Sequence, residues 1–462
     1  MNTVRKFAIS AMTLGFSFTT QIVRARGDLP MRTLMRYWAA AAVLVTTSSV
    51  LLPCAEAMAQ SNGSVIVEWN QLLQSNITGA PVGQPRSYAM LQIAIADAVV
   101  AIEGDYRPFH ARVSAPSGAS AEAAAAQAGH DVLVSLFPAT QAAADAALAN
   151  RLAQINPGQS MLGVQVGKRA AAAILAWRAN DGYAGANPQP PAFVASTLPG
   201  IWVPLASGPY QFSLIYTVTP FGLLTPFQFL PTPFPQLESP EYAEAFNEVK
   251  EVGRLDSTVR TPEQGRFAQL FAGNGPAYKN VTNVFRVWSN VARDVSRSNS
   301  LSLVDTARLF AMMWASMHDS ILTSHSSKAV YRLWRPETAI AHADIDNNPA
   351  TDAEPGWAPL IPTPPYPAYS SDMTCIATGA SRMVAHVLRS DAQSFTVTWY
   401  AATGGVVDTQ RYTSLSALAI DEANSRVWGG IHYRFDLEGS RASCTQVADY
   451  LFDNYMEPRR DD

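Results

Sequence analysis

The chain has 462 residues, of which 48% are hydrophobic and 15% are charged, and its formal net charge is −4. This length allows roughly two or three domains, or one large helical domain, each with an ordinary hydrophobic core. The charge balance gives no general basic field and therefore does not predict a nucleic-acid-binding protein. Any affinity for anions has to come from local clusters of cationic side chains.

The N-terminal region has the pattern of a secretory signal peptide. A basic segment (31–37) precedes an apolar segment (38–52), and Ala57-Met58-Ala59 forms a small-x-small cleavage site. Cleavage after Ala59 predicts a mature protein that is periplasmic or secreted, and residues 1–30 then suggest a misassigned start with Met31 as the true one. An uncleaved anchor is the alternative, but the apolar segment is short for a membrane span. No other segment reaches spanning length, so we expect no membrane span in the mature chain.

Removal of this signal peptide would take away Cys54 and leave Cys375 and Cys444. In an oxidising compartment these two cysteines can form a disulfide. Two buried thiols are the alternative, and the sequence leaves that choice open. Neither cysteine has the spacing of a zinc ligand set, so we expect no zinc site.

The apolar periodicity and the capping residues predict a chain that is mostly helical. The expected helices begin with one within 64–104 and two alanine-rich helices over 118–150, which are separated at Pro138. Further helices are expected over 162–180, from Ser239 onward, and over 261–272 after the cap Thr261. Three more are expected over 280–296, 302–326 and 373–388. Residues 183–240 are rich in proline and aromatic residues, which disfavours a helix. This segment is either a surface connection or a wall of a substrate cleft.

Only 287–291 (VWSNV) and 395–400 (FTVTWY) have the composition of strands, so the predicted fold class is all-α, built from helix bundles. We expect an N-terminal helical region with the irregular connection (60–240) and a C-terminal helical bundle (241–462). His130, His318 with Asp319, and His325 are interpreted as structural: His130 in a helix, His318 and Asp319 as satisfied core groups, and His325 as a helix-end residue.

The chemistry is concentrated between Lys328 and Asp436. Lys328 and Arg335 are seven residues apart, which predicts that both lie on one face of a helix that Pro336 closes. An ammonium and a planar guanidinium together suit the oxygens of an anion.

A second cluster of cationic residues follows near the C-terminus. Arg426 and His432 are six residues apart and are separated by Gly429 and Gly430, so we expect a turn between them and a helix that opens at His432 (432–455). Asp436 lies one helical turn further on. It can accept the proton of one ring nitrogen of His432 and leave the other nitrogen as a nucleophile or a ligand.

The spacing Lys-x6-Arg-Pro, then Pro-x-Tyr, then Ser-Arg-x5-His-x3-Asp resembles the vanadium-dependent haloperoxidases and the type 2 phosphatidic acid phosphatases, and is most similar to the exported bacterial haloperoxidase-like branch. The matching residues are Lys328, Arg335, Pro336, Ser425, Arg426, His432 and Asp436. The resemblance implies a pocket for vanadate, or for phosphate as the alternative. Lys328, Arg335 and Arg426 would neutralise the oxygens, with Ser371 as a further binding residue. His432 would be the vanadium ligand in a peroxidase or the nucleophile in a phosphatase.

The middle motif of the family, Pro-Ser-Gly-His, is altered in this chain. Aligned on Tyr369, the serine is retained as Ser371, but Asp372 replaces the glycine and Met373 replaces the acid/base histidine. Methionine cannot transfer a proton, and a carboxylate beside an anion weakens binding of that anion. Without the resemblance, Ser370-Ser371-Asp372 is simply a helix N-cap.

Three functions therefore remain. The first is a haloperoxidase acting on peroxide and halide, with Asp372, His342 or a water as the replacement acid/base. The second is a phosphomonoesterase that uses His432 as its nucleophile. The third is a catalytically impaired member of the family that binds an oxyanion without turning it over.

Overall fold

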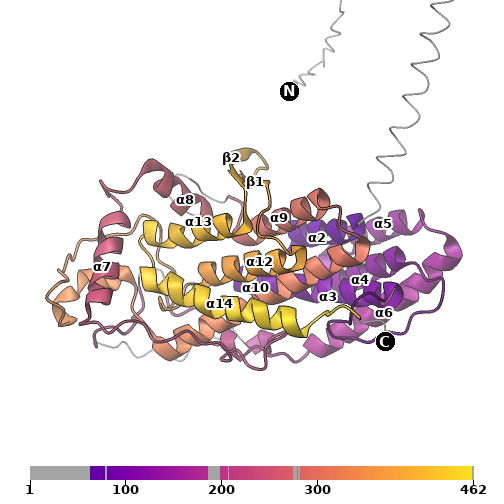
Figure 1. Cartoon of the computed structure of the whole chain (residues 1–462), viewed down its shortest axis with the longest axis horizontal. Helices are drawn as coiled ribbons and strands as arrows, with labels where there is room; N and C mark the ends of the chain where they lie inside the picture. Colours follow the sequence, from indigo (N-terminus) through magenta and orange to yellow (C-terminus); the bar gives the residue numbers. More distant parts are fainter. Residues whose placement is uncertain are drawn as a thin grey trace, which may run out of the picture. The chain divides into compact units, whose positions relative to one another are not determined.

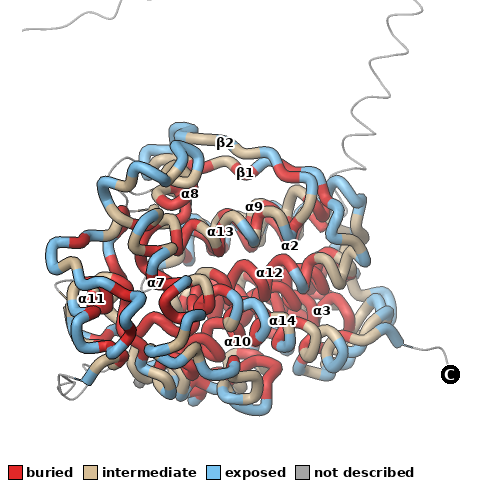
Figure 2. Tube along the Cα trace, turned by 60° about the vertical axis from the view of Figure 1, so that its left-hand side comes forward, coloured by how far each residue is buried: buried red, intermediate tan, exposed pale blue. Residues whose placement is uncertain are grey.

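Helix α10 (Leu303–Tyr331) lies at the centre of the helical bundle, and its residues are buried almost without interruption from Val304 to Lys328 (Figures 1 and 2). Helices α3 (Gln84–Glu103), α12 (Asp372–Leu388) and α14 (Arg434–Asn454) pack directly against it. The computed structural model describes residues 63–78, 81–185, 198–205, 208–273, 278 and 281–459. The predicted signal peptide therefore lies outside the described residues.

The remaining helices surround this centre in two groups. The group on the side of α3 consists of α2 (Ser64–Asn76), α4 (Ala121–Leu136), α5 (Gln141–Leu152) and α6 (Pro157–Arg178) (Figure 1). The group on the side of α12 and α14 consists of α7 (Pro240–Val252), α8 (Pro262–Ala272), α9 (Val284–Ser298), the short α11 (Pro336–Ala341) and α13 (Leu415–Trp428). Strands β1 (Phe395–Tyr400) and β2 (Val406–Tyr412) form an antiparallel hairpin. The all-α prediction is confirmed, with this hairpin as the single β-sheet of the described residues.

Local signals placed most helix boundaries correctly. Ser239 and Thr261 cap α7 and α8 as predicted, and the alanine-rich region divides at Pro138. The strand predicted at 395–400 is β1. The helix predicted over 280–296 is α9, so residues 287–291, which have the composition of a strand, are helical. The buried apolar residues of α9 recur with helical spacing at Val284, Val287, Trp288, Val291 and Val295.

The proline- and aromatic-rich segment has no α-helix among its described residues and is anchored on α10. Both carboxylate oxygens of Asp319 accept backbone N–H groups, from Phe221 at 2.8 Å and from Gly222 and Leu223 at 2.7 and 3.1 Å. Nδ1 of His318 lies 3.0 Å from the same carboxylate. The prediction that His318 and Asp319 are satisfied core groups is confirmed.

The helices that carry the candidate site residues are held together by small residues and by a disulfide. At the contact of α10 with α12, a side chain at Gly379 would meet the Ser320 hydroxyl at 2.5 Å, and the Ser316 hydroxyl donates to the Gly379 carbonyl at 2.9 Å. Cys375 on α12 and Cys444 on α14 form a disulfide, with their Cα atoms 5.4 Å apart. The structure thereby decides in favour of pairing over two thiols.

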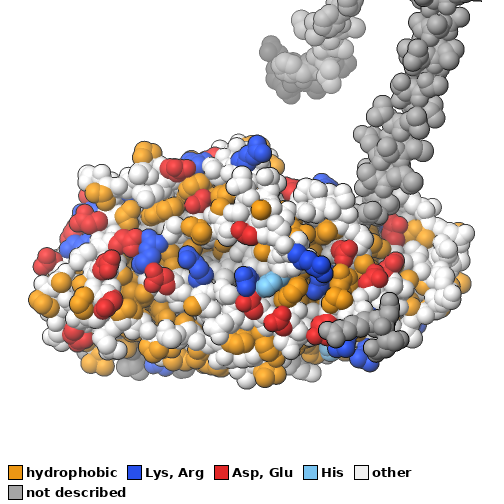
Figure 3. Space-filling view, viewed as in Figure 1, with side chains coloured by type: hydrophobic (Ala, Val, Ile, Leu, Met, Phe, Trp, Pro, Cys, Tyr) orange, Lys and Arg blue, Asp and Glu red, His pale blue; other side chains and the backbone are white. Residues whose placement is uncertain are grey.

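On the face drawn in Figure 3, Lys and Arg side chains are interspersed with Asp and Glu. Among the described helices, none combines the length and the apolar composition that a bilayer crossing requires.

Candidate oxyanion site

Lys328 lies in the last turn of α10 and is fully buried. Its ammonium donates to the carbonyls of Pro367 at 2.9 Å and Ala368 at 3.1 Å, and also to that of Ser370. The Asp372 carboxylate lies 3.5 Å away. The ammonium therefore fixes the segment that leads into α12, while its charge remains inside the site.

Arg335 reaches the site from a different element, so the prediction that it shares a helical face with Lys328 is wrong. Helix α10 ends at Tyr331 because Arg332 adopts the left-handed conformation (φ 51°). Arg335 is then the extended N-cap of α11, as Pro336 requires of the residue before it.

The Arg335 guanidinium is fully buried and points at His432. It donates from Nε to the Tyr366 carbonyl at 2.7 Å and from Nη1 to the Ile431 carbonyl at 2.8 Å, and Nη1 lies 2.9 Å from Nε2 of His432. Its Nη2 is buried without a hydrogen-bond partner among the described residues. A buried guanidinium nitrogen of this kind is suited to donate to a ligand oxygen.

His432 lies in the turn between α13 and α14. The left-handed backbone at Gly430 (φ 83°) supports this turn, and a side chain there would collide with the Gly253 carbonyl at 2.4 Å. Helix α14 begins at Arg434, two residues later than predicted, so His432 precedes the helix rather than opening it.

The orientation of the His432 ring is set by Asp436, as predicted. Oδ2 of Asp436 accepts Nδ1–H of His432 at 2.7 Å and the backbone N–H of Tyr433 at 3.0 Å. Because the second bond fixes this oxygen as an acceptor, Nδ1 carries the proton and Nε2 presents a lone pair.

Burial controls the protonation of these groups. Desolvation, reinforced by Arg335 and Lys328, holds the pKa of His432 well below 6.5, so the imidazole is neutral. Burial lowers the pKa of Arg426 to about 10 and that of Lys328 to about 8, so both remain cationic at neutral pH. Burial raises the pKa of Asp436 to about 7. The site thus joins a neutral imidazole to three buried cations.

A cavity of about 130 Å³ opens beside His432. Its polar lining consists of Tyr366, Asp372, Arg426 and His432, and its remaining lining is largely apolar, including Phe285 from α9 and Met373 from α12. Lys328 contacts Asp372, and Arg335 contacts His432, but neither cation lines the cavity itself.

The altered middle motif forms the start of α12. Ser371 is the N-cap and accepts the Thr374 N–H at 3.4 Å, which confirms the predicted cap. Asp372 and Met373 both line the cavity. His342 is exposed at the C-terminal end of α11 and does not line the cavity, so it is not placed to act as the replacement base.

Two buried titratable residues at the site were not predicted. His325, interpreted from sequence as a helix-end residue, lies inside α10 and is only 1% exposed, with Nε2 3.3 Å from Oδ2 of Asp372. Glu422 is fully buried on α13, one turn before Arg426, and accepts the Trp288 indole N–H at 2.9 Å. Burial raises the pKa of Glu422 well above 4.5, so it is neutral. The sequence signal for both was helical spacing: His325 precedes Lys328 by three residues and Glu422 precedes Arg426 by four, so each pair lies on one helix face.

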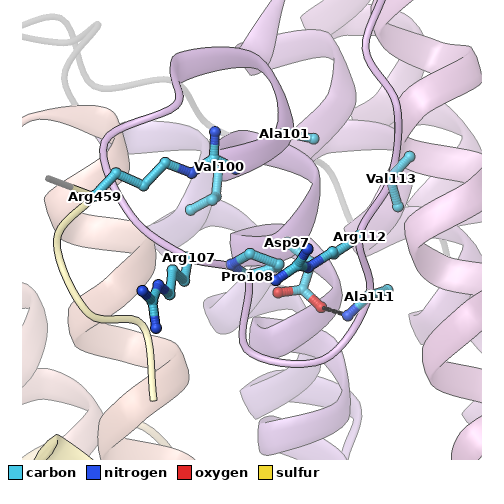
Figure 4. A pocket seen from close by; sticks show the side chains of 9 residues that line it. All are labelled: Asp97, Val100, Ala101, Arg107, Pro108, Ala111, Arg112, Val113 and Arg459. Atoms are coloured by element: carbon cyan, nitrogen blue, oxygen red, sulfur yellow. Dashed lines mark hydrogen bonds between the residues drawn. The ribbon is translucent and has the colours of Figure 1, made fainter. Parts of the chain in front are cut away.

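A larger cavity, of about 360 Å³, lies near the C-terminus and is lined by residues that include Asp97 (Figure 4). The Asp97 carboxylate accepts the backbone N–H groups of Phe109 at 2.6 Å and Ala111 at 2.7 Å, so it anchors the loop after α3. The arginines in its lining, Arg107, Arg112 and Arg459, are exposed. This cavity lacks the buried cations of the site beside His432.

Comparison with known proteins bears on the C-terminal bundle first. Residues 308–461 match the family model described as the VCPO second helical-bundle domain, a range that runs from within α10 to beyond the end of α14 and includes Lys328, Arg335, Asp372, Arg426 and His432. The C-terminal third of the chain is thus similar to the second helical bundle of that family. No curated protein sequence gives a significant match.

Solved structures of bacterial vanadium-dependent peroxidases share the fold. A bacterial vanadium-dependent iodoperoxidase aligns with a TM-score of 0.68 and 22% identity over 86% of this chain and 96% of its own. A holo-type bacterial vanadium-dependent chloroperoxidase aligns with a TM-score of 0.63 and 16% identity over 82% of this chain and 93% of its own. The shared fold therefore extends over most of the chain.

Proposed function

We propose that the chain is a vanadium-dependent haloperoxidase-like enzyme that oxidises halide with peroxide at a vanadate held by Lys328, Arg335, Arg426 and His432. The observation that carries this proposal is the neutral His432, with Nδ1 bound to Asp436 at 2.7 Å and Nε2 directed toward the buried guanidinium of Arg335. Bound vanadate would supply Lewis-acid activation of the peroxide.

The residues fit a tetrahedral oxyanion. Lys328, Arg335 and Arg426 are all buried, and desolvating each cation costs several kcal/mol unless negative charge compensates it. Among the described residues, Lys328 alone of the three has a carboxylate within 4 Å, that of Asp372, while Asp436 bonds His432 and the Glu422 carboxyl is neutral. Nη2 of Arg335 has no hydrogen-bond partner among the described residues. An oxyanion would supply both the missing charge and the missing acceptor.

The test begins with purified protein loaded with orthovanadate and assayed for peroxide-dependent oxidation of iodide, bromide and chloride. We expect turnover that is lost in His432→Ala and retained in His386→Gln, a histidine on the outer side of α12. Hydrolysis of p-nitrophenyl phosphate that depends on His432, without halide oxidation, would replace the proposal by the phosphomonoesterase. Vanadate binding without either activity would identify the impaired oxyanion-binding protein.

A further inference from the structure

His325 is a buried imidazole whose surroundings provide one polar partner. Neither of its ring nitrogens makes a hydrogen bond of good geometry with the described residues, although Nε2 lies 3.3 Å from Oδ2 of Asp372. Its aromatic neighbours are Tyr366 and Phe212, with ring centroids 5.6 and 6.4 Å away. A buried imidazole without firm hydrogen bonds is costly, so a purely structural account of His325 is weak.

Asp372 connects this imidazole to the cavity. Its Oδ1 accepts the Ser324 hydroxyl at 2.6 Å and lies 3.5 Å from the Lys328 ammonium, while Oδ2 faces His325. The carboxylate also lines the cavity together with Arg426 and His432. One carboxylate therefore has the candidate ligand site on one side and a buried proton acceptor on the other.

The capping of α12 does not require a carboxylate at this position, although the carboxylate does lie beside the buried Lys328 ammonium. Ser371 already caps α12, and Lys328 already donates to three backbone carbonyls. A carboxylate beside the site also opposes the binding of an anion. Its presence is explained if it takes part in proton transfer, which Met373 cannot perform.

We propose that Asp372 and His325 form the proton-transfer pair of this site, in place of the histidine that the middle motif lacks. This inference rests on the proposed peroxidase function. The O–H bond of a peroxide in the cavity breaks as its proton moves to Oδ2 of Asp372, and the electron pair stays on the peroxide oxygen near Arg426. Nε2 of His325 then accepts the proton from Oδ2, and the same route returns it when the product needs a proton.

The electrostatics of the pair favour a relay over storage of the proton on Asp372. Burial alone would raise the pKa of this carboxyl, but the opposing charges, the Lys328 ammonium first among them, hold the pKa well below 3.8. A proton that reaches Asp372 is therefore passed on. The charged and titratable groups that face the pair are Lys328 on α10, Tyr366 before α12, Arg426 and His432 across the cavity, and Arg335 and Tyr210 at longer range.

The first test uses the full chain without vanadate. The ring signals of His325 are followed by NMR as a function of pH in the wild type and in Asp372→Asn, and then after addition of orthovanadate. We expect both Asp372→Asn and vanadate to move the midpoint of the His325 titration, with no such movement for His386. If the ring signals of His325 respond to neither change, the proposal that Asp372 and His325 act as a pair is overturned.

The second test uses the loaded enzyme and His325→Gln, which keeps a polar side chain but cannot carry the proton. General acid–base catalysis typically contributes about 10²–10⁴-fold. We expect kcat to fall by at least about tenfold, the acid limb of the pH–rate profile to change, and vanadate affinity to stay within about threefold. His325→Ala with added imidazole should recover part of the rate, and thermal unfolding checks that both variants fold.

The two proposals fail in different ways. A rate and pH profile of His325→Gln that match the wild type overturn the pair and leave the peroxidase intact. A wild type that oxidises no halide overturns the peroxidase function. The NMR experiment then tests the Asp372–His325 pair separately: a shift of the His325 signals on addition of vanadate supports the pair, and the absence of a shift overturns it.

Discussion

Nη1 of Arg335 lies 2.9 Å from Nε2 of His432, the nitrogen that Asp436 leaves available. The same guanidinium holds the carbonyls of Tyr366 and Ile431, so it fixes the turn that carries His432 as well as supplying charge. A ligand oxygen near Nε2 would meet Arg335 immediately. Arg335 is thus both a structural and an electrostatic part of the candidate site.

Arg335→Lys should weaken the site without removing its charge. An ammonium cannot replace the planar fork that reaches Tyr366, Ile431 and His432 together. Hydrogen bonds to charged groups contribute about 1.5–3 kcal/mol, which corresponds to roughly a 10- to 100-fold loss of orthovanadate affinity by calorimetry. Arg441→Lys, an exposed change on α14, is the matched control and should change little. Equal affinity in the two variants would contradict this role.

Asp436→Asn should impair the site through the tautomer of His432. The new amide can present N–H to Nδ1, which would move the ring proton to Nε2 and remove the lone pair needed there. Changes in such supporting partners typically cost about 10–100-fold in affinity or activity. Vanadate affinity and the halide oxidation rate measure the effect, and Glu438→Gln, an exposed carboxylate on the same helix, is the control. If Asp436→Asn binds vanadate as the wild type does, Asp436 does not orient the ring.

The sequence predicted the fold class, most helix starts and the identity of the cationic residues, because caps, prolines and apolar periodicity are local. Residues 287–291 alone have the composition of a strand, because five residues are too few to separate a strand from a helix, but the helix predicted over 280–296 is present as α9. Lys328 and Arg335 were placed on one helix because the helix ends at Arg332, which adopts the left-handed conformation. Glycine is the usual residue in that conformation, and an arginine gives no sequence signal of a helix end.

The site was predicted less completely, because its protonation depends on contacts between distant segments. The local sign at His325 was its spacing of three residues from Lys328, but its partner Asp372 comes from another helix and its aromatic neighbours are Tyr366 and Phe212. Asp372 was predicted to oppose an anion or to replace the acid/base, but its contacts with Lys328 and Ser324 could not be inferred from spacing.

The Cys375–Cys444 disulfide should stabilise the site as well as the fold. Cys375 follows Asp372 on α12, and Cys444 lies two turns after Asp436 on α14, so the bond joins the two helices that carry these carboxylates. Disulfides typically contribute about 2–4 kcal/mol to stability. We expect Cys375→Ser with Cys444→Ser to lower Tm and to weaken vanadate binding. A double variant with unchanged Tm and affinity would show that packing alone holds α12 against α14.

Oxyanion affinity should fall as pH rises through about 8, the value to which burial lowers the pKa of Lys328. Below this pH the ammonium is charged and attracts the anion, and above it the neutral amine does not. Sulfate is a suitable probe in calorimetry because its charge does not change in this range. Asp436, with a pKa raised to about 7, gains negative charge in the same direction at slightly lower pH, so the titration is repeated in Asp436→Asn. In that background, Lys328→Met should bind sulfate weakly and lose the fall near pH 8. A fall that persists without Lys328 would assign it to another group.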